Sequence, residues 1–257
     1  MRVKSLVILA VIAGAAAYMI LLTPQWAIDF YDKATGYGPA ATPTEAMDKY
    51  LKAVKARKLK IAAKFCTGDY AEQLKRGAPA GQEIGPLIDG ISDYMKNKGL
   101  ATDKCVLYLH LLDPLPTNVK TGAAPKEIDA NTAKGYFVWE GLSMMDRNFR
   151  DVADFQLFLN TFANEQRQMD GKMFNTVLRP VNLFDPKGFD IVKDGDGWKL
   201  KFAAPPPVQV QAIDHYINNY KAYVTRLTVY RRDVTNDRYP GKAEFERELV
   251  TALQESK

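Results

Sequence analysis

The stretch Thr42–Lys75, TPTEAMDKYLKAVKARKLKIAAKFCTGDYAEQLK, decides the fold that this sequence predicts. Thr42 suits a helix N-cap, Pro43 suits the first helical position, and Glu45 stands where a capping box places its acidic residue. Apolar residues then recur at helical spacing, and a second amphipathic segment follows near Lys58–Cys66. The sequence therefore predicts two amphipathic helices here.

The chain after this helix pair first continues with helical patterns and then turns to strand patterns. Further helices are expected over Tyr70–Lys75 and Pro86–Lys98. Branched and aromatic residues predict strands at Lys104–Leu112, Gly135–Leu142, Asn175–Val181, Phe189–Val192 and Trp198–Phe202, with a helix at Val152–Gln168. The run Asp194–Gly197, DGDG, predicts a hairpin turn. Helices followed by a mostly antiparallel sheet indicate the α+β class.

Two motifs resemble the NTF2-like superfamily. One is the helix pair of Thr42–Lys75, and the other is the closing strand Asp196–Leu200, DGWKL. This resemblance implies helices packed on a curved antiparallel sheet, a cone that often encloses a cavity. Because the superfamily includes both enzymes and non-catalytic binding modules, the resemblance does not fix a function.

The N-terminal segment Leu6–Leu22, LVILAVIAGAAAYMILL, contains no charged residue. At 1.5 Å per residue it spans roughly 26 Å, which is enough for a transmembrane helix. Arg2 and Lys4 precede it, so we expect a cytoplasmic N-terminus and an extracytoplasmic bulk, a single-pass protein of the inner membrane. The alternative is a signal peptide that is cleaved near Ala15–Ala17. Either reading places the bulk of the chain in the periplasm of a bacterial envelope.

Four regions follow from these patterns. We expect a transmembrane anchor over 1–23, a juxtamembrane linker over 24–41, an NTF2-like α+β domain over 42–204, and a helical C-terminal extension over 205–257.

Cys66 and Cys105 are the two cysteines of the chain. In an oxidising compartment we expect them to form a disulfide. The alternative is a pair of buried thiols.

The net charge of +5, from 35 basic and 30 acidic residues, is too mild to indicate nucleic acid. A basic run nevertheless crosses the first helix pair, with Lys52, Lys55, Arg57, Lys58, Lys60 and Lys64. Lipid headgroups, anionic polymers or an acidic protein face are its possible partners, and an ordinary solvated helix face is the alternative.

Enzymatic signatures are absent from the sequence: it contains no GxSxG, HExxH, P-loop or dinucleotide-binding pattern. Asp194 and Asp196 fit a hairpin turn better than a calcium loop, because Trp198 stands where a third ligand is needed. We therefore predict a non-catalytic protein with no cofactor and no metal. A candidate pocket, in the cone that the resemblance implies, would be lined by Tyr94, Tyr108, His110 and Trp139.

The C-terminal sequence predicts two helices, the first from Val208 to about Asp233 and the second from about Lys242 to Gln254. An apolar stripe at spacings of three and four runs along the first of them. Tyrosine suits an interface because it packs apolar area and keeps a hydroxyl in water. The residues that we expect to contact a partner, or a second copy, are Tyr216, Tyr220, Tyr223, Leu227 and Tyr230. The alternative is that this stripe packs within the protein itself.

Together these observations favour an accessory, scaffolding or binding subunit that docks to a membrane-associated partner complex. One alternative is a protein that binds a small apolar ligand, such as a lipid or a quinone, in the NTF2-like cavity. Another alternative is an enzyme of isomerase or hydrolase type, with a buried carboxylate beside Tyr or His.

Overall fold

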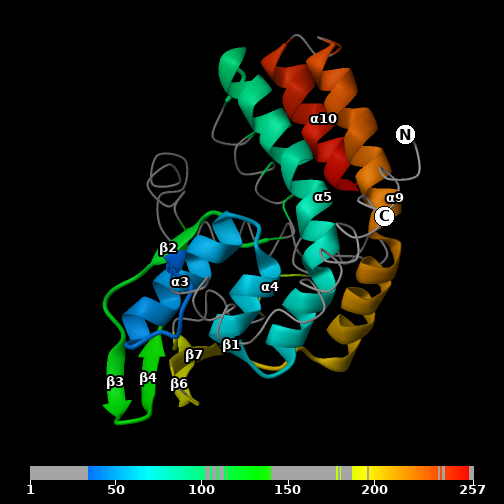
Figure 1. Ribbon diagram of the computed structural model, residues 1–257. Helices are drawn as coiled ribbons and strands as arrows, with labels where there is room; N and C mark the ends of the chain where they lie inside the picture. Colours follow the sequence, from blue (N-terminus) through cyan, green and yellow to red (C-terminus); the bar gives the residue numbers. More distant parts are fainter. Residues whose placement is uncertain are drawn as a thin grey trace, which may run out of the picture. The chain divides into compact units, whose positions relative to one another are not determined.

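The computed structural model divides the chain into two compact units, Met1–Pro39 and Ala40–Lys257. It describes residues 34–101, 105, 109, 113, 115–139, 178, 180, 187–195, 197–236, 238 and 241–254. The architecture below is that of the second unit (Figure 1).

Helix α3, Pro43–Lys55, begins as its sequence predicts. The Thr42 side chain accepts a hydrogen bond from the Glu45 backbone N–H at 3.2 Å. The Glu45 carboxylate in turn accepts from the backbone N–H of Ala41 at 2.6 Å, one residue before the N-cap. These two bonds satisfy N–H groups that the helix itself leaves without acceptors. The predicted helix start is therefore confirmed.

Helix α4, Leu59–Ala62, and the 3₁₀ turn η1, Ala63–Phe65, lead into the short strand β1, Cys66–Thr67. The chain then forms α5, a 29-residue helix over Asp69–Asn97. The sequence predicted two separate helices here, Tyr70–Lys75 and Pro86–Lys98. The predicted break between them is wrong, because the helix is continuous.

Helix α5 continues through Pro79 and Pro86 because both prolines lie on its exposed side. A proline deprives the carbonyl four residues earlier of its helical donor. On the exposed side, water can take the place of that donor.

The sheet has five strands in the order β1-β7-β6-β4-β3. Strands β3 (Lys126–Asp129), β4 (Thr132–Gly135), β6 (Phe189–Asp194) and β7 (Gly197–Lys201) pair antiparallel, and β1 joins β7 in parallel. A second, two-stranded antiparallel sheet pairs β2 (Val119–Thr121) with β5 (Phe137–Trp139). The β6–β7 turn confirms the predicted hairpin, with Gly195 at φ +63°.

An aromatic cluster fills the space between α3 and the sheet. Tyr50 stacks on Phe137 with ring centroids 5.7 Å apart, and Phe202 lies 4.7 Å from Phe189 and 5.0 Å from Tyr70. The Tyr50 and Tyr70 hydroxyls are 2.9 Å apart, and Tyr70 donates to the carbonyl of Leu178 at 2.9 Å. Tyr50 is therefore the donor to Tyr70, because each hydroxyl has one proton.

Helix α9, Pro207–Thr235, packs along α5, and α10, Lys242–Gln254, contacts α9 (Figure 1). Arg76 pairs with Asp214 at 2.6 Å, and Glu83 accepts from Lys221 at 2.6 Å. The residue numbers of these partners rise together, so α5 and α9 run parallel. The predicted C-terminal helices are present with nearly the expected bounds.

The predicted fold class needs correction. The described residues form a mixed α/β arrangement, and none of their helices is both long and apolar enough to cross a membrane. The fold class with a transmembrane helix is thus wrong for the chain as described, and Leu6–Leu22 lies outside the described residues. The strand expected at Lys104–Leu112 is also wrong where it is described, because Cys105 and Leu109 are helical. Val152–Gln168 lies outside the described residues, as does all of Asn175–Val181 except positions 178 and 180.

Candidate functional site: a buried arginine–aspartate network

Arg57 follows the end of α3 in the left-handed conformation, with φ +56°. Its backbone N–H donates to the carbonyl of Val54, and the N–H of Lys58 donates to that of Ala53, both at 2.8 Å. This is the Schellman pattern, in which glycine usually occupies the left-handed position. An arginine there carries backbone strain of about 1 kcal/mol or more, so its side chain must contribute something that glycine lacks.

The side chain of Arg57 crosses α5 at Gly85. A Cβ atom added at Gly85 would lie 2.1 Å from Arg57 Cδ, a distance that real Cβ atoms do not show. Because Gly85 has no side chain, it leaves the space in which the Arg57 side chain lies against α5.

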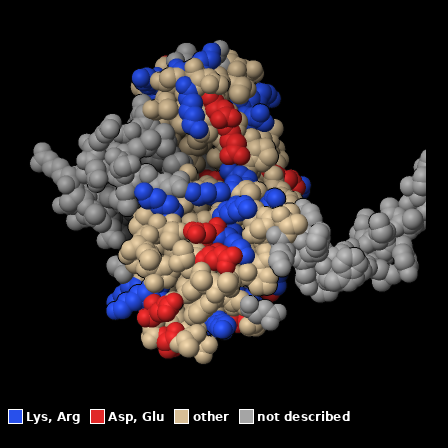
Figure 2. Space-filling model, turned by 60° about the vertical axis from the view of Figure 1, so that its left-hand side comes forward, with Lys and Arg blue, Asp and Glu red and all other residues tan. Residues whose placement is uncertain are grey.

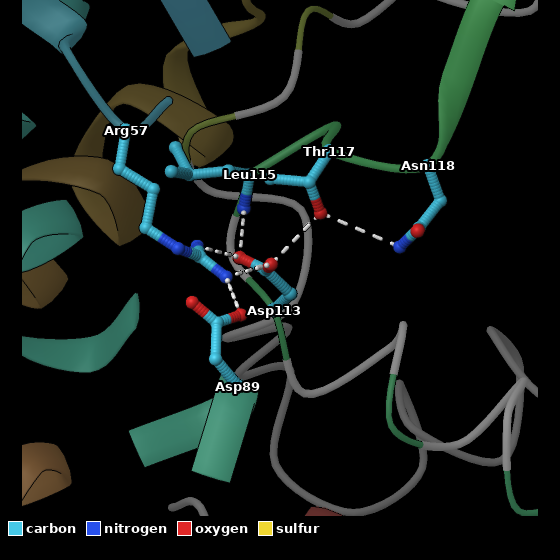
Figure 3. A network of polar contacts seen from close by, with 6 residues as sticks. All are labelled: Arg57, Asp89, Asp113, Leu115, Thr117 and Asn118. Carbon is cyan, nitrogen blue, oxygen red and sulfur yellow. Dashed lines mark hydrogen bonds and ion pairs between the residues drawn. The ribbon is translucent and has the colours of Figure 1, made fainter. Parts of the chain in front are cut away.

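The guanidinium ends on two carboxylates (Figure 3). Nη1 and Nη2 of Arg57 donate to Oδ1 and Oδ2 of Asp113 at 3.1 and 3.0 Å, which is a bidentate pair. Nη2 also donates to Asp89 on α5 at 2.9 Å. The Asp113 side chain is only 2% exposed, against 13% for Arg57 and 63% for Asp89.

Asp113 receives two more hydrogen bonds from its own segment. Oδ1 accepts from the backbone N–H of Leu115 at 3.0 Å, and Oδ2 accepts from the hydroxyl of Thr117 at 2.9 Å. Asn118 extends the network to Thr117 at 3.4 Å. Each carboxylate oxygen of Asp113 thus accepts two bonds, which uses the four acceptor positions of an ionised carboxylate.

The electrostatics agree with this geometry. Burial disfavours the charged guanidinium, but the Asp113 and Asp89 carboxylates outweigh it, and the pKa of Arg57 is raised. On α9, burial raises the pKa of Tyr216 and Tyr223, and the nearby negative charge of Asp113 adds to both effects. The Arg57–Asp113 pair therefore lies where α3, α5, α9 and the 113–118 segment meet.

In chemical terms, this site keeps the charges of Arg57 and Asp113 in fixed positions. The Arg57 charge is permanent, and the Asp113 oxygens are occupied by donors of the chain itself. Among the described residues, no group of three or more His, Cys, Asp or Glu side chains is arranged to hold a metal ion. The arrangement is suited to cross-linking three parts of the unit: the end of α3, helix α5 and the 113–118 segment.

The residues Tyr216, Tyr220, Tyr223, Leu227 and Tyr230 of α9 are called the tyrosine stripe below. This stripe lies largely inside the unit. Tyr216, Tyr223 and Leu227 are buried, and α5 is the main neighbour of this helix. Tyr220 is half-buried and donates to Glu83 at 3.0 Å, and Tyr230 is also half-buried. The burial of Tyr216, Tyr223 and Leu227 agrees with the alternative that the stripe packs within the protein, where α5 is the main neighbour of α9. Docking of a partner through this stripe stays a prediction.

Tyr94 is the one residue of the candidate pocket whose side chain the structure describes. Tyr94 is half-buried on α5, with Lys98 Nζ 5.7 Å from its ring centroid. Tyr108, His110 and the Trp139 side chain lie outside what is described. The candidate pocket therefore stays a prediction.

The expected disulfide is not formed, because Cys66 and Cys105 are not bonded to each other and both are buried. Burial raises the pKa of the Cys66 thiol well above its ordinary value, which keeps it protonated and unreactive. The alternative of two buried thiols agrees with the structure.

Sequence reasoning missed the Arg57–Asp113 network. Arg57 was grouped with the lysines of the basic run, and Asp113 lies 56 positions further along the chain, beyond any local pattern. One signal was present, the spacing of Gly77, Gly81 and Gly85 at every fourth residue of α5. Such spacing places three small residues on one helix face, and this face admits Leu178, Leu59 and Arg57.

Comparisons of this chain with protein families, with curated proteins and with solved structures found no match.

Proposed function

We propose that this chain is a non-catalytic accessory or scaffolding subunit that works by docking to a protein partner. One observation carries the proposal: the buried ion pair Arg57–Asp113 is saturated by donors of the chain itself. A carboxylate that serves as a general base needs an acceptor position open to the substrate. Asp113 instead joins distant segments, as expected of a rigid support.

The docking surface of this proposal is the outward side of α9. Helix α9 packs on α5 and also contacts α10, so the side chains of α9 that stay exposed are what it presents to a partner. Val229, 43% exposed, is the most exposed large apolar side chain among those described on that helix. Ile128 on β3, 57% exposed, is a matched position on a different element.

The test is native purification of the full-length chain, with its mass and its co-purifying chains measured. We expect a stoichiometric partner that is lost from Val229→Glu and retained by Ile128→Glu. Both substitutions place a charge at an exposed site, so both variants should fold. A monomeric wild-type chain contradicts the proposed function, and equal retention by both variants contradicts the assigned surface.

A further inference from the structure

Five lysines project from the corner between α3 and α4. We name this set the lysine corner: Lys52, Lys55, Lys58, Lys60 and Lys64, all exposed. The sequence contains no Asp or Glu between Asp48 and Asp69. Figure 2 shows Lys and Arg side chains gathered in a band across the middle of one face of the molecule, with Asp and Glu mainly above and below the band.

The lysine corner stands on a fixed base. Val54 and Leu59, between its members, are buried, as are Ala53, Ala62 and Ala63. The Arg57 cross-link ties this same corner to α5 and to Asp113. The lysines are therefore carried by a backbone that is held in place.

The arginine and the lysines of this segment lie in different environments. Its one arginine, whose planar guanidinium suits bidentate pairing, turns inward to Asp113, and lysines occupy the surface. A lysine ammonium acts as a hydrated point charge, which suits attraction to an array of anions without fixed geometry.

Apolar insertion is not a feature of this corner. The large hydrophobic side chains that are exposed in the described residues are Ile128, Tyr136, Val210 and Val229, and they lie on other elements. The α3–α4 corner thus lacks the aromatic platform on which single-stranded nucleic acids stack. It also lacks the apolar face of a helix that inserts into lipid.

We propose that the lysine corner binds the phosphate headgroups of an anionic lipid surface through charge alone. The proposal does not rest on the accessory-subunit function, because a protein partner at α9 and a lipid surface at α3–α4 use different residues. Each exposed lysine near such a surface contributes about fivefold to binding.

The experiment measures binding of the full-length chain to two sets of vesicles, zwitterionic phosphatidylcholine alone and phosphatidylcholine with phosphatidylglycerol. We expect tighter binding to the anionic vesicles, and this gain should shrink as salt increases. Lys58→Gln/Lys60→Gln should weaken the anionic component at least about tenfold, at two lysines of about fivefold each. The control, Lys126→Gln/Lys193→Gln, removes the same charge from exposed positions of the sheet and should leave binding within about twofold.

Four results would overturn this inference. Equal binding to both kinds of vesicle removes the role of headgroup charge, and an equal loss in the control pair shows an effect of net charge only. Displacement by inorganic phosphate at constant ionic strength points to a discrete phosphate site. Binding to duplex DNA that is tighter than to vesicles, and lost in Lys58→Gln/Lys60→Gln, assigns the corner to nucleic acid. Thermal unfolding of each variant shows that the fold is retained.

Discussion

The Arg57–Asp113 network and the aromatic cluster both bury polar atoms, but they use them differently. The network holds a full positive and a full negative charge at fixed geometry. The cluster holds two neutral hydroxyls, Tyr50 and Tyr70, among rings that pack by shape. Both join the helices to distant parts of the chain, Asp113 in one case and the Leu178 carbonyl in the other.

The difference concerns what each region tolerates. A buried charge that loses its partner keeps its full desolvation penalty, so the network is intolerant of single changes. A buried neutral hydroxyl or carbonyl that loses its partner also keeps a desolvation penalty, but a smaller one than a charge does. The predictions below test this contrast, beginning with the largest effect.

Asp113→Ala leaves the guanidinium of Arg57 buried with Asp89 as its remaining carboxylate. We expect a loss of about 3–5 kcal/mol in the free energy of unfolding, measured by urea denaturation. The double variant Arg57→Met/Asp113→Leu removes both charges and should recover most of this loss. A single-variant loss below about 1 kcal/mol contradicts the importance of the pair.

Gly85→Ala places a methyl group on the path of Arg57. We expect a loss of about 1–3 kcal/mol from overpacking, although alanine favours a helix. With Arg57→Ala in place the methyl group has room, so Gly85→Ala should then be neutral or stabilising. If the effect of Gly85→Ala is the same in both backgrounds, the clash is not with Arg57.

Tyr70→Phe removes the hydroxyl that links Tyr50 to the Leu178 carbonyl. The expected loss is about 1–2 kcal/mol, smaller than at Asp113 because no charge is left unpaired. Tyr136→Phe changes a tyrosine that is 38% exposed and should stay within about 0.5 kcal/mol of wild type. A loss at Tyr70 as large as at Asp113 would remove the contrast between the two regions.

Alkaline pH should reveal the burial of Tyr50. Burial raises the pKa of Tyr50 well above its ordinary value of 10.0, and Tyr70 and Cys66 add to the effect. Above pH 10 the unfolded chain loses this proton and the folded chain keeps it, so stability falls as pH rises. Between pH 10 and 11 the free energy of unfolding of the wild type should fall more steeply than that of Tyr50→Phe, by about 1 kcal/mol over this pH unit. Equal slopes would show that Tyr50 titrates normally in the folded protein.

Lys221→Ala is the smallest change of the set. The Lys221–Glu83 pair is exposed and screened by solvent, so we expect no measurable shift in the unfolding midpoint. A clear loss would show that exposed pairs of the α5–α9 contact matter as much as the buried one.

Local signals were sufficient where one short segment determines the structure. The α3 start depends on Thr42 and Glu45, three positions apart, and the β6–β7 turn depends on the run at Asp194–Gly197. Each gave a correct element because the decisive contacts lie within a few residues. The same approach fails at α5, where Pro79 and Pro86 look like helix breakers until the packing shows that both face outward.

The site could not be predicted because its contacts are long-range. Arg57 resembles its lysine neighbours in sequence, and only the fold separates it from them. Its conformation depends on Gly85 on the next long helix and on a carboxylate 56 positions away. The tyrosine stripe was recognised from its spacing, but spacing alone does not distinguish a neighbour within the chain from a partner.

The parallel arrangement of α5 and α9 has a consequence for folding. The bonds between Glu83 and Lys221 join residues 138 positions apart, so this contact closes a long loop and contributes to slow folding. During synthesis, at about 5–20 residues per second, the side of α5 that α9 covers emerges from the ribosome many seconds before α9. In that interval the nascent chain exposes an apolar helix face without its cover, which makes it a target for chaperones until the tyrosine stripe arrives.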